Sequence, residues 1–142
     1  MALLELKGLT KRFGALLALS DIDLSVARGE VHCLLGENGA GKSTLCNLIF
    51  GVHRPDAGTM VFDGQAFAPT GPVDALQQGI AMVHQHFSLV STMTVVENLM
   101  MGRSTALLDP QRMRARLKVL ADTYQLQIDS ARVVGELSVG ER

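Results

Sequence analysis

The nine residues GENGAGKST at positions 36–44 constrain this chain more than any other feature, because they match the pattern G-x-x-x-x-G-K-[ST]. A short apolar run, VHCLLG, comes before them, and a stretch of helical character, STLCNLIFG, comes after. Such an apolar run is typical of a strand that is covered on both faces. A buried strand, a glycine-rich turn and a helix in this order predict a loop that holds phosphate groups.

Each residue type in the motif has a physical reason. The glycines let the backbone curl so that N–H groups point at a phosphate, and the following helix adds the positive end of its dipole. Lys42 brings a point charge to the β- and γ-phosphates, Ser43 offers a hydroxyl to Mg²⁺, and Thr44 contacts the α- and β-phosphates. The glycines do not have the G-x-G-x-x-G spacing of a dinucleotide site. The predicted nucleotide-binding residues are Gly36, Glu37, Asn38, Gly39, Ala40, Gly41, Lys42, Ser43 and Thr44.

Composition excludes several other classes of protein. The 142 residues, 47% hydrophobic and 19% charged, suit one globular domain with a moderate core. A net charge of −1 supplies no general field for nucleic acid or an anionic membrane. Residues 75–96 contain no Asp, Glu, Lys or Arg, but glutamines and histidines interrupt them too often for a membrane span. Cys33 and Cys46 lie in apolar surroundings and are predicted to be buried thiols in a reducing, cytoplasmic compartment.

The order of predicted elements indicates an α/β fold with an antiparallel part in front. Alternating residues predict strands over 3–9 and 19–26, and further strands are expected over 59–64 and, as compact apolar runs, over 31–36 and 80–85. Helices are expected over 43–51, over 71–79 with Pro72 in the first turn, and from a Thr94 cap onward. The clearest helix runs from Pro110 to Tyr124, with Asp109 as its cap.

Three motifs in order, GENGAGKST, MVHQHF and LSVGE, resemble those of the ATP-binding cassette family, the ATPase subunits of ABC transporters. The resemblance runs over the whole chain and implies a P-loop NTPase fold of the ABC type, with ATP and Mg²⁺ as cofactors. It implies an antiparallel β-subdomain over about 1–30 and 56–70, a P-loop core over about 31–55 and 71–86, and a helical subdomain over about 87–142.

The resemblance also assigns roles outside the P-loop. Phe13 would stack on adenine, although a single Phe near a strand end is more often a core residue. Gln85 would contact Mg²⁺ or the attacking water, which makes it, with Lys42, a predicted catalytic residue. Ser138 and Gly140 would bind the γ-phosphate of ATP held by a second cassette. A serine cap and a glycine N–H at a helix start suit an anion, although an ordinary capped helix has the same pattern.

The segment VHQHFSLVSTMTVVENLMMG is similar to a narrower group, the importers of simple sugars and nucleosides. In that group the stretch corresponding to Phe87–Gly102 receives a helix of the membrane subunit. The implied partners are therefore permease subunits, a second cassette and, indirectly, a solute-binding protein, with no nucleic acid. The implied place is the cytoplasmic face of the inner membrane, as a peripheral subunit. Ser91 stands where this group commonly has proline.

Several features of the family are absent from this sequence. They are the apolar strand ending in Asp (Walker B), the catalytic Glu, the D-loop and the switch His, so the chain is expected to be truncated before the Walker B strand. We expect ATP hydrolysis no faster than in a Lys42→Ala variant and, since the missing strand would lie beside VHCLL, an uncovered apolar edge there. Three hypotheses stay open: the N-terminal part of an importer ATPase, a non-catalytic nucleotide-binding product, and a non-transport member of the family.

Overall fold

The computed structural model describes residues 2–84, 89–101, 109–138 and 140. The chain divides into two compact units, Met1–Val83 (unit 1) and His84–Arg142 (unit 2), and each is described here by itself. Within the described residues, no helix is both long and apolar enough to cross a membrane.

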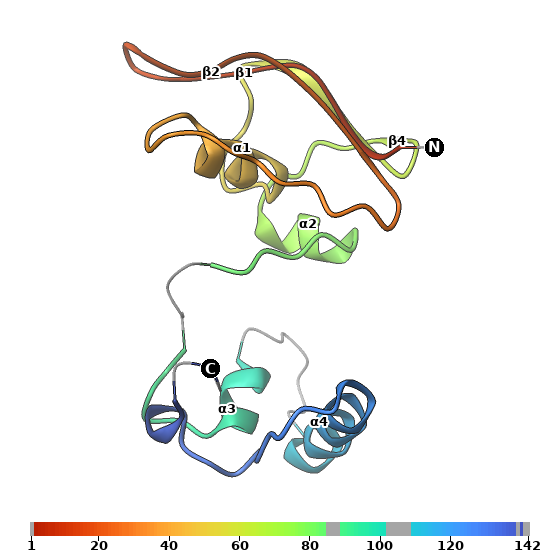
Figure 1. The fold of residues 1–142 in the computed structure, drawn as a ribbon, viewed down its shortest axis with the longest axis vertical. Coiled ribbons are helices and arrows are strands. Elements are labelled where there is room, and N and C mark those ends of the chain that lie inside the picture. Colours follow the sequence, from red (N-terminus) through yellow and green to blue (C-terminus); the bar gives the residue numbers. More distant parts are fainter. Residues whose placement is uncertain (1, 85–88, 102–108, 139, 141–142) are drawn as a thin grey trace. The chain divides into compact units, whose positions relative to one another are not determined.

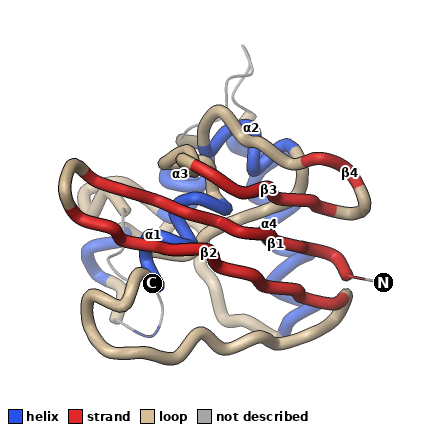
Figure 2. Tube along the Cα trace, turned by 90° about the horizontal axis from the view of Figure 1, so that it is seen from above, coloured by secondary structure: helices blue, strands red, loops and turns tan. Residues whose placement is uncertain are grey.

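An antiparallel sheet forms the first part of unit 1. Strands β1 (Ala2–Phe13) and β2 (Leu16–Ala27) form a hairpin, and β3 (Ala57–Phe62) pairs with the other edge of β1. A short β4 (Gln65–Ala66) completes the order β2-β1-β3-β4, seen as the red segments of the tube in Figure 2. The strands predicted over 3–9, 19–26 and 59–64 are thereby confirmed.

Helix α1 (Lys42–Ile49) covers one face of this sheet and closes the core of unit 1 (Figure 1). Leu6 and Leu9 of β1 and Leu48 of α1 are fully buried, which places the centre of the core between the sheet and the helix. The helix ends at Ile49 with Phe50 as its C-cap, and Gly51 follows with a φ of 77°, a conformation that favours glycine. The short helix α2 (Pro72–Gln77) begins with its proline, as predicted.

The two compact apolar strands predicted over 31–36 and 80–85 are not formed in the described residues. Residues 31–36 and 80–84 have no regular secondary structure, Val31 and Leu35 are each 91% exposed, and Val83 is 93% exposed. A strand needs a neighbour to receive its N–H and C=O groups, and among the described residues named strands pair only within β1–β4. The prediction of two strands is therefore wrong for this structure, and with no strand at VHCLL the expected strand edge is not formed either, although Val31 and Leu35 are exposed.

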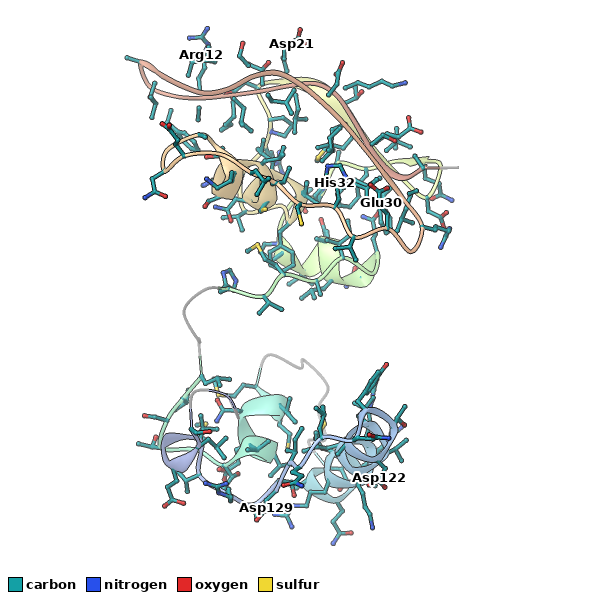
Figure 3. All side chains as sticks on the ribbon, in the orientation of Figure 1. Arg12, Asp21, Glu30, His32, Asp122 and Asp129 are labelled. Carbon is teal, nitrogen blue, oxygen red and sulfur yellow. The ribbon has the colours of Figure 1, made fainter. Side chains whose placement is uncertain are left out.

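Side-chain hydrogen bonds, not a strand ladder, hold the start of this segment. Glu30 accepts a hydrogen bond from the Ala27 N–H at 2.6 Å, and its other carboxylate oxygen lies 2.9 Å from His32 Nδ1 (Figure 3). The pKa of Glu30 is lower than its usual 4.5, first because of the Ala27 N–H and second because of His32. The segment is thus anchored at the end of β2 while its apolar residues remain exposed.

The predicted burial of the two cysteines is wrong. Cys33 and Cys46 are both free thiols and both exposed. Cys33 lies in the uncovered segment after β2, and Cys46 lies on the face of α1 opposite the buried Leu45 and Leu48. Burial was expected because the sequence neighbours of both cysteines are apolar, but apolar neighbours in the sequence do not by themselves cover a side chain.

The described residues of unit 2 form two helices and one turn of 3-10 helix. Helix α3 (Val95–Met100) begins at the predicted Thr94 cap, and α4 (Pro110–Tyr124) has the predicted bounds. The Asp109 carboxylate caps α4 by accepting hydrogen bonds from the N–H groups of Gln111 and Arg112 at 2.9 and 3.2 Å. The turn η1 (Val134–Glu136) follows a bridge between Val133 and Thr94.

Candidate phosphate-binding site

The glycine-rich loop at 36–41 has the backbone conformation that its sequence predicts. Gly39 and Gly41 have φ values of 86° and 87°, in the left-handed region that favours glycine. A Cβ atom at Gly41 would lie 2.6 Å from the Ala18 carbonyl oxygen and 2.6 Å from Leu19 Cδ2. Only glycine therefore fits where the loop passes against β2 and turns into α1.

Lys42 folds back over this loop. Its Nζ donates hydrogen bonds to the carbonyl oxygens of Gly36 and Glu37, both at 2.7 Å. An ammonium group has three N–H donors, so these two bonds leave one for an anion in the loop. The loop also closes on itself through the Ala40 N–H, which donates to the Glu37 carbonyl at 3.2 Å. The sequence thus brings a positive charge against the curled backbone of the loop.

The start of α1 supplies the second feature of an anion site. No side chain in the described residues caps this helix, and its first turn contains no acidic residue. The N–H groups at a helix start have no partner within the helix, and the helix dipole makes this end positive. The loop backbone, the Lys42 ammonium group and the uncapped helix start lie next to one another in the sequence. Together they form a set of hydrogen-bond donors that fits a phosphate chain.

The predicted metal contacts are placed only in part. Ser43 is exposed and Thr44 half-buried in the first turn of α1, beside the loop. Gln85, the other predicted Mg²⁺ and catalytic residue, lies outside the described residues. In the part of the chain that the structure describes, no group of three or more His, Cys, Asp or Glu side chains is placed to hold a metal ion.

The residues predicted to bind a second ATP lie in unit 2. Ser138 and Gly140 follow η1, and a Cβ atom at Gly140 would have no heavy atom within 4 Å. Val139 and Glu141 lie outside the described residues. The predicted docking segment Phe87–Gly102 is described over 89–101, where it contains α3. These roles remain predictions, and unit 1 alone carries the loop geometry.

Phe13 ends β1 and is 40% exposed, so it is not the core residue that a lone phenylalanine near a strand end more often is. The closed end of the β1–β2 hairpin and the loop before α1 lie on the same side of unit 1 in both Figure 1 and Figure 2. The Phe13 ring contacts His53 and Lys11. Sequence reasoning missed His53, because no local pattern relates it to β1.

A cavity of about 390 Å³ lies elsewhere in unit 1, lined by residues that include Arg54, Met60 and Phe67. None of the predicted site residues lines it. The phosphate loop is instead exposed over residues 36–40.

The sequence of residues 19–142 matches the family described as ABC transporter. The chain belongs to this family. It is an ABC transporter ATP-binding domain, and the resemblance drawn from its three motifs is confirmed. The matched range begins in β2 and includes the whole phosphate loop.

Curated relatives of this ABC domain include a ribose import ATP-binding protein RbsA from Burkholderia mallei, 44% identical over 144 residues. A second relative, the ribose import ATP-binding protein RbsA 2 from Burkholderia cenocepacia, is 43% identical over 144 residues. Each alignment covers 99% of this chain and 28% of the relative. The chain therefore spans about 28% of the length of these relatives.

Among solved structures, the ABC domain is similar to MJ1267, an ATP-binding cassette of an ABC transporter, in its ADP conformation. The TM-score is 0.84 at 28% sequence identity, and the match covers 99% of this chain and 61% of that one. The chain thus has the part of the ABC ATPase fold that this match covers, with the antiparallel sheet present as predicted.

Proposed function

We propose that this chain is the ATP-binding part of an importer ATPase and that it holds the triphosphate of ATP on residues 36–44. The observation that carries the proposal is the position of Lys42, whose ammonium lies across the loop carbonyls at the uncapped start of α1. A triphosphate would accept hydrogen bonds from the loop and helix N–H groups, while Lys42 balances its charge.

The remaining site residues have these proposed roles. Ser43 would hold Mg²⁺, which, when bound, neutralises charge that develops on the phosphates. Thr44 and its neighbouring N–H groups would hold the α- and β-phosphates. Phe13 would stack on the base, and Gln85 would contact the metal ion or the attacking water. Ser138 and Gly140 would bind the γ-phosphate of a nucleotide in a second cassette.

The whole transporter is a further step of the same proposal. The relatives are named as ribose import proteins, which favours a simple sugar over a nucleoside as the solute. Permease subunits would dock on residues 87–102, and a solute-binding protein would act through them. The ATPase would lie at the cytoplasmic face of the inner membrane. The division into an antiparallel β-subdomain (about 1–30 and 56–70), a P-loop core (about 31–55 and 71–86) and a helical subdomain (about 87–142) is also part of this proposal.

Binding of Mg-ATP to the 142-residue chain, measured by isothermal calorimetry, tests the nucleotide site. We expect Lys42→Ala to weaken binding by about 10- to 100-fold, since a hydrogen bond from a charged group contributes about 1.5–3 kcal/mol. Lys7→Ala is the matched control, because Lys7 lies on β1 with a 72% exposed side chain and pairs with Glu5 at 3.8 Å. Equal affinity of the Lys42→Ala variant and the unmodified chain would refute the proposal.

A further inference from the structure

Phe13 is held by the ring of a residue distant in the sequence. The centroids of the Phe13 and His53 rings lie 5.1 Å apart, and the ring planes meet at 73°. This is the edge-to-face arrangement that aromatic pairs prefer. Phe13 is nevertheless 40% exposed, and His53 is half-buried. The contact therefore restricts the orientation of a ring that still offers surface to a ligand.

A second contact restrains the same ring. Lys11 Nζ lies 5.5 Å from the Phe13 ring centroid, within the range of a cation–π interaction. Asp56 holds Lys11 through an ion pair of 3.1 Å, and its other carboxylate oxygen accepts a hydrogen bond from the Arg12 N–H at 2.7 Å. The Arg12 side chain itself points away from α1 (Figure 3).

Helix α1 places His53. The Asn47 carbonyl accepts hydrogen bonds from the N–H groups of Val52 and His53, at 2.9 and 3.3 Å, where the chain leaves the helix at Gly51. The start of the same helix carries Lys42 and the phosphate loop. One eight-residue helix thus fixes the phosphate loop at its start and, at its end, the residue that contacts Phe13.

We propose that His53 is a positioning residue for base recognition: it holds the Phe13 ring in the orientation that stacks on the base of a nucleoside triphosphate. Lys11 and Asp56 brace the ring from the β1 side. This inference rests on the proposed nucleotide site. An ordered ring loses less rotational freedom on binding than a free one, so its pre-orientation increases affinity. The gain applies only to ligands that carry a flat aromatic base.

The test compares two probes on the full 142-residue chain, Mg-ATP and Mg-tripolyphosphate, which lacks the base. We expect His53→Ala to weaken Mg-ATP binding by about two- to tenfold, the range set by an aromatic pair, and to leave tripolyphosphate binding unchanged. His53→Phe keeps an aromatic ring and should restore ATP affinity. Val52→Ala is the matched control, because Val52 is the exposed neighbour of His53.

Phe13→Ala gives the coupling measurement. It should weaken Mg-ATP binding at least as much as His53→Ala, and the double variant should lose no more than Phe13→Ala alone, because His53 acts through the Phe13 ring. Circular dichroism checks that each variant is folded. If His53→Ala does not fold, His53→Phe serves as the second variant.

Three results would overturn the inference: equal weakening of both probes, additive losses in the double variant, or unchanged or tighter ATP binding by His53→Ala. Failure of the proposed function has a different signature. In that case Lys42→Ala would not change binding of either probe, and the role of His53 would fall with the site.

Discussion

Unit 1 buries nine hydrophobic residues in one cluster between its sheet and its helices, whereas the described residues of unit 2 bury only Val96, Ala121 and Val134. In unit 1 the cluster joins residues that are distant in the sequence, such as Leu9 of β1 and Leu48 of α1. The stability of unit 1 therefore depends on the apolar surface that folding removes from water.

Hydrogen bonds join distant segments in the described residues of unit 2. The backbone after α4 runs along the segment before α3, with the N–H groups of Val134 and Gly135 donating to the carbonyls of Met93 and Ser91 at 2.9 and 2.8 Å. The Asn98 side chain adds bonds to the same segment from within α3. We therefore expect substitutions that remove buried side-chain volume to destabilise unit 1 most, and substitutions that remove hydrogen bonds to destabilise unit 2 most.

The largest effect is expected from Leu48→Ala in unit 1. Leu48 is 0% exposed, and replacing a fully buried leucine by alanine costs about 2–5 kcal/mol through lost burial and the cavity left behind. Hydrogen exchange followed by mass spectrometry, which reads each unit separately, should record the loss in β1, β3 and α1 but not in α4. Leu16→Ala, at a residue 65% exposed, should cost about 0.5 kcal/mol or less.

Asn98→Ala should give the next largest effect, in unit 2. The Asn98 Oδ1 accepts a hydrogen bond from the Val90 N–H at 2.8 Å, and its Nδ2 donates to the carbonyls of Val90 and Thr94 at 3.0 and 3.1 Å. Partly buried backbone groups that lose such partners cost about 1–3 kcal/mol. Hydrogen exchange should quicken over residues 89–98, a part of the predicted docking segment.

Gln111→Ala is the matched control, because it removes an exposed amide side chain from α4 in the same unit. An Asn98→Ala variant that exchanges like the unmodified chain would remove the contrast between the units. Asn98→Asp keeps the acceptor for the Val90 N–H but sets a carboxylate against the carbonyls, so it should be no more stable than Asn98→Ala.

Local signals in the sequence predict the sheet, the helices and the phosphate loop. The alternation in β1 and β2 gives their pairing face, and Asp109 followed by Pro110 gives the start of α4. Glycines and Lys42 give the loop, because only those residue types suit a curled backbone around an anion. Each of these signals lies within a few residues of the feature it specifies.

Features that depend on distant segments could not be predicted in this way. Val31 and Leu35 are as apolar as the core residues of β1, yet they are exposed because burial needs a covering element and an adjacent strand. The exposure of Cys33 has the same cause. The contact between Phe13 and His53 is also non-local, since the end of α1 creates it and no spacing in the sequence announces it.

The smallest effect tests whether hydrogen bonds to the Glu97 carboxylate help to order unit 2. Glu97 accepts hydrogen bonds from the Thr94 N–H and hydroxyl, both at 2.7 Å, and Thr94 Oγ1 accepts one from the Glu97 N–H at 3.3 Å. The pKa of Glu97 is lower than its usual 4.5, first because of the Thr94 N–H and second because of the Thr94 hydroxyl. The folded unit therefore favours the ionised carboxylate.

The sign of the pH dependence follows from this direction. The stabilisation is complete above pH 4.5 and is lost as the pH falls through the lowered pKa of the folded unit. In an NMR titration, the Glu97 carboxyl and the Thr94 amide should share a midpoint below 4.5, and Thr94→Ala should raise the midpoint of Glu97. Glu97→Gln keeps an acceptor for the cap but cannot ionise, so the Thr94 amide should stop responding to acid. A midpoint at or above 4.5 in the unmodified chain would mean that these bonds do not favour the ionised carboxylate.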